Sequence, residues 1–168
     1  MHMMDEDHLL TIGYDADDQG SFAWFTGVML QIFDVSDPEN PVRTHKEVIG
    51  TRGSSSAALN SLLAFNYFAP LELLALPMTV CEDSSGGGSY GSTMTFSGLM
   101  VYDATVGAGF QLRGKVEHPA GQDIGCNNWW TDAGSQVERS IIMADDDDSY
   151  VFSVSRSLIK VNSLDDLA

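Results

Sequence analysis

The sequence predicts an all-β protein built from antiparallel strands, on three observations. The segment from Val28 to Val35 is rich in β-branched, aromatic and long apolar residues and has the length of a typical strand. Pro38 and Pro41 follow it, and proline lacks the amide hydrogen of a ladder and biases the preceding residue away from helix. A second extended segment, Val42 to Ile49, comes directly after this turn and ends at Gly50. The two segments are therefore expected to pair as a hairpin.

The same pattern returns twice downstream. An aromatic residue precedes Asp103 as it precedes Asp34, and a third copy around Asn162 places the aligned positions 69 and then 59 residues apart. Each copy also follows an apolar strand, at 9–12, 73–76 and 150–154. Repeated four-stranded units of this kind are typical of a β-propeller, whose blades are radially packed sheets. The chain holds material for roughly two and a half blades, a partial propeller.

Other segments complete the predicted elements. Ala57 to Leu63 is the one segment with a helical pattern, and Phe65 to Leu76 is interpreted as two strands joined by a tight hairpin at Ala69-Pro70. Val137 to Met143 is a further strand. Three aromatic residues lead into the Val28 strand: Phe22, Trp24 and Phe25. They are expected to face the core rather than to form a binding surface.

Four segments carry a family resemblance: Leu9 to Gly20, Phe33 to Pro38, Gly53 to Phe65, and Leu158 to Leu167. In this order they resemble the C-terminal part of a secreted bacterial β-propeller family that is distantly related to WD-repeat proteins. The resemblance implies a secreted or cell-envelope location, with a signal sequence that is not in this chain. It implies that residues 1–168 form a single propeller-like domain, the C-terminal fragment of a longer protein. Residues 1–7 are expected to be disordered or introduced by cloning.

The net charge limits the classes of partner. The chain carries 24 acidic and 8 basic residues, for a formal net charge of -16. Such a charge repels nucleic acid and anionic membrane surfaces, so no nucleic-acid partner is expected. Membrane insertion is not expected either, because no apolar run approaches the roughly 20 residues that span a bilayer.

The two cysteines are Cys81 and Cys126, each in a segment of loop-like composition. In the oxidising compartment that the resemblance implies, they are predicted to form a disulfide that ties two long loops together on one face of the propeller. A buried pair of free thiols is the alternative. A metal site is disfavoured because neither cysteine has a second cysteine or a histidine at ligand spacing.

Acidic clusters give the best lead to a ligand. Asp15, Asp17 and Asp18 precede Gly20 in a pattern like the first half of a calcium loop, in which oxygen ligands surround a hard cation. A second candidate lies in the run of four aspartates that begins at Asp145 and includes Asp147. Calcium is therefore a possible cofactor, and a solvated hairpin tip is the alternative.

The catalytic motifs that occur in the sequence lack the structural context that their chemistry needs. The glycine-rich segment 86–91 formally fits both a nucleophile elbow around Ser89 and a dinucleotide fingerprint, but both motifs need a following helix, and Ser92 to Phe96 is β-like. No metal pair is indicated by the spacing of the four histidines, which are His2, His8, His45 and His118. No serine is singled out for a Ser/His/Asp triad.

These observations predict a secreted, non-catalytic binding or scaffold module that engages a protein partner through propeller-face loops. Trp129 and Trp130 are the candidate binding surface, because exposed aromatic pairs on loops are typical of interaction sites. The alternative is a hydrolase-like enzyme that uses the acidic loops and a divalent cation. Open blade edges also predict a possible homodimer through edge-to-edge pairing.

Overall fold

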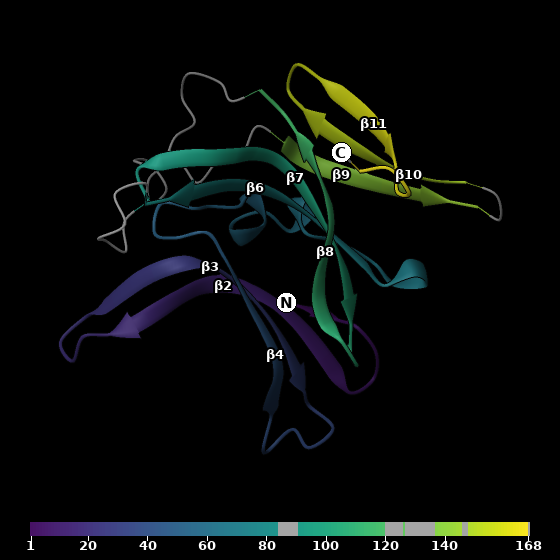
Figure 1. The fold of residues 1–168 in the computed structure, drawn as a ribbon. Helices are drawn as coiled ribbons and strands as arrows, with labels where there is room; N and C mark the ends of the chain where they lie inside the picture. Colours follow the sequence, from purple (N-terminus) through teal and green to yellow (C-terminus); the bar gives the residue numbers. More distant parts are fainter. Residues whose placement is uncertain (84–90, 120–125, 127–136, 146–147, 168) are drawn as a thin grey trace.

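The computed structural model describes residues 1–83, 91–119, 126, 137–145 and 148–167, and within them the chain is almost entirely β (Figure 1). The strands form three antiparallel sheets. The first sheet has the order β1-β2-β3-β4. Its strands are β1 (His2–Met3), β2 (His8–Asp18), β3 (Ala23–Asp34) and β4 (Val42–Ile49).

The second and third sheets follow along the chain. The second sheet has the order β5-β6-β7-β8, and the third has the order β11-β10-β9. Their strands are β5 (Asn66–Phe68), β6 (Leu73–Glu82), β7 (Thr93–Thr105), β8 (Gly109–Glu117), β9 (Val137–Ala144), β10 (Ser149–Ser155) and β11 (Ile159–Ser163). Two sheets of four strands and one of three confirm the prediction of an all-β partial propeller.

The short helical segments correct one detail of the prediction and refine another. Ala57 to Leu63 holds two single 3-10 turns, η1 (Ala57–Leu59) and η2 (Leu62–Ala64), rather than an α-helix. The first turn is capped by the Ser56 hydroxyl, which accepts a hydrogen bond from the amide of Ala58 at 3.1 Å. The predicted hairpin forms between β5 and β6, and Ala69-Pro70 lies in a third such turn, η3 (Ala69–Leu71), within its connection. No helix among the described residues is long and apolar enough to cross a membrane.

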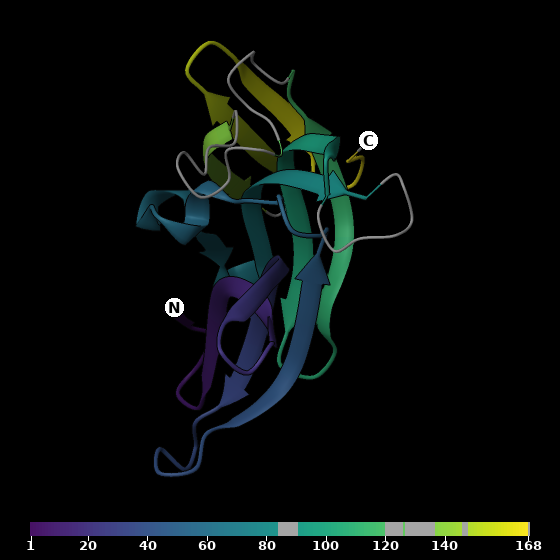
Figure 2. The ribbon, with the colours of Figure 1, turned by 90° about the vertical axis from the view of Figure 1, so that its left-hand side faces the viewer.

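The second sheet lies between the other two, so its central strands, β6 and most of β7, are buried on both faces (Figures 1 and 2). In β6 every residue from Leu73 to Cys81 is buried. Leu74 and Leu76 pack in the core shared with the first sheet, whereas Leu73 and Ala75 pack in the core shared with the third. A strand covered on both sides needs a continuous apolar run rather than an alternating one, which is what β6 has.

One main-chain hydrogen bond recurs in all three sheets and fixes the register of the repeat. The amide of Val35 donates to Asp7 O at 2.7 Å, that of Ala104 to Glu72 O at 2.8 Å, and that of Leu164 to Ser149 O at 2.9 Å. The residues that precede these three amides are Asp34, Asp103 and Ser163. The third copy is therefore aligned through Ser163, and the sequence alignment through Asn162 was wrong by one residue.

The N-terminal segment pairs with the first sheet, and its origin, as expected from the sequence, stays a prediction. His2 and Met3 pair with Leu10 and Leu9 at the edge of the first sheet, and the amide of Met4 donates to His8 O at 2.8 Å. The His2 ring lies 5.4 Å from that of Tyr67. These contacts hold the segment in place because they pair its backbone amides and carbonyls and pack the His2 side chain against the second sheet.

Candidate interaction surface

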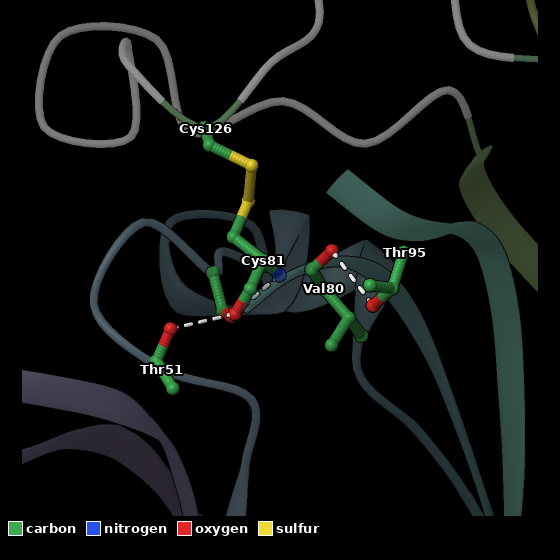
Figure 3. The surroundings of a disulfide bond; sticks show 6 residues. Thr51, Val80, Cys81, Thr95 and Cys126 are labelled. Carbon is green, nitrogen blue, oxygen red and sulfur yellow. Dashed lines mark hydrogen bonds between the residues drawn. A yellow bond between two sulfur atoms is a disulfide. The ribbon is translucent and has the colours of Figure 1, made fainter. Parts of the chain in front are cut away.

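The Cys81–Cys126 disulfide forms, as predicted (Figure 3). The sulfur atoms are 2.07 Å apart and the Cα atoms 5.8 Å apart. Both residues are buried. The bond therefore attaches Cys126 to the end of β6, and it is compatible with an oxidising, extracellular compartment.

The segment that follows β4 packs onto this disulfide. The amide and the hydroxyl of Thr51 both donate to Cys81 O, at 2.9 and 2.8 Å, and the amide of Cys81 donates to the Ser54 hydroxyl at 2.9 Å (Figure 3). Gly53 has a φ of 111°, and a Cβ there would lie 2.7 Å from Gly91 O. Only glycine fits this left-handed, crowded position. Loops from three parts of the chain thus meet at one junction.

An aromatic hairpin tip lies next to the junction. Phe22 lies in the turn between β2 and β3 and is 56% exposed, and Phe25 lies near the start of β3 and is 41% exposed. The Trp24 ring, which is partly buried, has the Arg52 guanidinium carbon 4.0 Å from its centroid. Arg52 also binds the junction, because its carbonyl accepts a hydrogen bond from the Gly91 amide at 2.6 Å. We call Phe22, Trp24, Phe25, Arg52 and the disulfide the tip–disulfide surface.

The exposure of Phe22 and Phe25 corrects the expectation that they face the core, whereas Trp24 is partly buried. Tyr14 in β2 still packs against the core shared by the first and second sheets, but beyond it the β2–β3 hairpin extends further, with Asp17 opposite Trp24. The sequence pattern could not reveal this, because residue alternation identifies a face of a strand but not how far the neighbouring sheet covers it.

Three of the predicted calcium ligands have protein partners in the structure. Asp15 forms an ion pair with Lys46, with a distance of 2.7 Å between Oδ1 and Nζ. Asp18 Oδ1 accepts a hydrogen bond from the Gly20 amide at 2.7 Å, so it stabilises the hairpin turn. Asp145 Oδ1 accepts a hydrogen bond from the amide of Asp148 at 2.8 Å. In the described part of the chain no three acidic, histidine or cysteine side chains gather as a metal group.

Calcium binding stays a prediction. A thermal melt of metal-stripped protein with and without millimolar calcium, with magnesium as the control, tests it, because a ligand raises the melting temperature only by binding the folded state preferentially. Asp147, Trp129, Trp130 and Ser89 lie outside the described residues, so the predictions on them also remain open.

A buried serine–histidine pair was missed by the sequence analysis. His118 Nε2 and Ser153 Oγ share a hydrogen bond of 2.7 Å. The two residues are 2% and 0% exposed, so the pair is enclosed between β8 and β10 rather than open to a substrate. Burial, and then the positive charge of Lys160, lower the pKa of His118 below its ordinary value. The pair is a polar contact between two sheets, and no spacing in the sequence could have joined residues 35 positions apart.

These features define a class of protein. Stacked antiparallel sheets that share buried faces, with connecting loops gathered at a common junction, are the architecture of a β-propeller, a fold that serves as a scaffold for interactions. Compared with known families, the chain matches the one described as the beta propeller domain over residues 1–167, and it belongs to that family. No curated protein and no solved structure matches it.

Proposed function

We propose that this chain is a secreted, non-catalytic scaffold that binds a protein partner through the tip–disulfide surface. The observation that carries the proposal is the exposure of Phe22 and Phe25 beside a junction held by a disulfide and by main-chain and hydroxyl hydrogen bonds. Exposed aromatic side chains on a rigid support are typical of binding hot spots, because they bury a large area at a small entropic cost.

Electrostatics indicates the chemistry of the partner. The net charge of the chain is -16, and Asp17 and Asp18 flank the aromatic tip. A basic protein surface with apolar residues at its centre would complement this site, since complementary charge steers encounter and apolar contact supplies affinity. No observation among the described residues favours the alternative of a cation-dependent hydrolase, since no three acidic, histidine or cysteine side chains gather there as a metal group.

Site-specific photo-crosslinking tests the proposal. A photoreactive residue at position 22 should capture a partner from the native secretome, whereas the same residue at Val42 should not. Val42 is a matched control because it is 59% exposed, like Phe22, but lies at the turn between β3 and β4.

The affinity of the purified chain for the captured partner then shows whether the tip–disulfide surface forms the binding site. Phe22→Ser and Phe25→Ser should each weaken binding by roughly tenfold or more, the effect of truncating a hot spot, and Val42→Ser should not change it. Equal losses for all three variants, or none, would contradict the proposal.

A further inference from the structure

The outer face of the third sheet is exposed and mostly apolar, with Arg139 opposite Val154 and Ser163 opposite Tyr150 at its ends. Strand register places Phe152 between Ile141 and Val161, and it places Val154 beside Ile159 and Tyr150 beside Met143. Four of these side chains are between 53% and 62% exposed: Ile141, Met143, Ile159 and Val161. Contiguous apolar patches of this kind mark interaction sites.

The outer face of the first sheet is the second uncovered face, at the opposite end of the stack (Figure 1). The register aligns Met29 with Val48 and Phe33 with Leu9 on this side. Between these pairs lie the polar residues Thr11, Gln31 and Lys46, and Arg43 lies opposite Phe33.

The recurrent main-chain bond shows that these two faces are of complementary type. Asp34, Asp103 and Ser163 are equivalent, so the face of each sheet on which they lie is equivalent; we call it the forward face, and the opposite one the rear face. The forward face of the first sheet, with Ile32, packs against the second sheet, and that of the second, with Val101, packs against the third.

Both junctions in the chain therefore join a forward face to a rear face. The faces left over are the forward face of the third sheet, which includes Val161, and the rear face of the first, which includes Val48. The polar residues on the rear face of the first sheet do not prevent it from packing against another sheet. The rear face of the third sheet also carries polar residues, Ser140, Ser153 and Lys160, and it is covered by the second sheet. There Lys160 Nζ donates to Glu117 O of the second sheet at 2.6 Å.

We propose that two copies of this chain associate by packing the forward face of each third sheet on the rear face of the other copy's first sheet. The two contacts are identical and related by a twofold axis, so the assembly closes. It contains six sheets, within the range of about four to eight blades that propellers adopt. This mode differs from edge-to-edge pairing, because it repeats the face-to-face junctions already present within the chain.

Salt should strengthen this association. Each copy carries a net charge of -16, so the two copies repel one another at long range, while the forward face of the third sheet contributes mainly apolar side chains to the contact. Screening reduces the repulsion and leaves the apolar contact intact. A dimer held by ion pairs would respond in the opposite way.

Sedimentation equilibrium on three matched valine variants tests the proposal. The wild-type chain has a mass of 18.2 kDa and should sediment at about twice that mass at concentrations of about 100 µM, where even weak specific pairs form. Val161→Asp and Val48→Asp should each give monomers, and Val42→Asp should remain dimeric. All three side chains are exposed, and circular dichroism melts confirm that the variants fold.

A mixture provides the decisive arm. An equimolar mixture of the Val161→Asp and Val48→Asp chains should regain dimers, weaker than the wild type, because one of the two junctions then joins two unaltered faces. A monomeric wild type overturns the proposal, and it is the result expected if another protein covers these faces. A dimer that survives Val48→Asp, or a mixture that stays monomeric, also overturns it, since each indicates like-face or edge pairing.

Discussion

Reduction of the Cys81–Cys126 disulfide should lower the free energy of unfolding by about 4 kcal/mol. The two cysteines are 45 residues apart, and on the chain-entropy relation a loop of that length restricts the unfolded chain by this amount at 25 °C. Because β7 and β8 lie inside the loop, the bond limits how far the second sheet can separate from the segment before β9 once the chain unfolds.

Equilibrium urea denaturation of the oxidised and the reduced protein measures the effect. With a denaturant slope of about 2 kcal/mol per M, the midpoint should fall by about 2 M on reduction. The double variant Cys81→Ala/Cys126→Ala is the control, since a reductant should leave its midpoint unchanged. Oxidised and reduced wild-type curves that agree within about 0.5 kcal/mol would show that loop closure does not stabilise this fold.

Three further predictions concern packing, backbone conformation and pH. Leu76→Ala should cost about 2 to 5 kcal/mol in urea denaturation because the side chain is fully buried, whereas Leu62→Ala, at an 85% exposed position, should stay within about 0.5 kcal/mol. Gly53→Ala should lower stability by about 1 to 3 kcal/mol, because alanine is strained at a φ of 111° and meets a carbonyl oxygen, and an unchanged melting temperature would refute this. The folded-state pKa of His118 is lowered, so the unfolded chain binds the proton more readily. Stability is therefore full above the unfolded pKa of about 6.5 and falls as the pH drops from there towards the folded pKa; His118→Gln should reduce this loss in denaturation curves recorded between pH 7 and 5.

Strand positions were predicted well wherever the sequence marks both ends. The segment from Val42 to Ile49 was predicted with the bounds that β4 has, because proline and glycine on either side exclude continuation of the ladder. The pairing of Cys81 with Cys126 was predictable because the chain has only two cysteines. Both successes rest on local chemistry that leaves few alternatives.

The interaction surface and the repeat register depend on tertiary structure and could not be predicted in this way. Phe22 and Phe25 have the composition of core residues, and their exposure follows from the length of a hairpin relative to the sheet beside it. Similarly, Ser163 replaces the aspartate of the other two copies, so side-chain identity pointed to Asn162 one position earlier. The equivalence is carried by a main-chain amide, which any residue except proline supplies.

The burial of the second sheet's central strands on both faces has a consequence for how the chain folds during synthesis. β6 and β7 leave the ribosome before β9 to β11, so the face that includes Leu73, Leu99 and Val101 stays exposed until the third sheet is made. Exposed apolar strands of this kind are prone to aggregate. Nascent chains that stop after β8 should therefore depend on chaperones more than chains in which β9 to β11 have been completed.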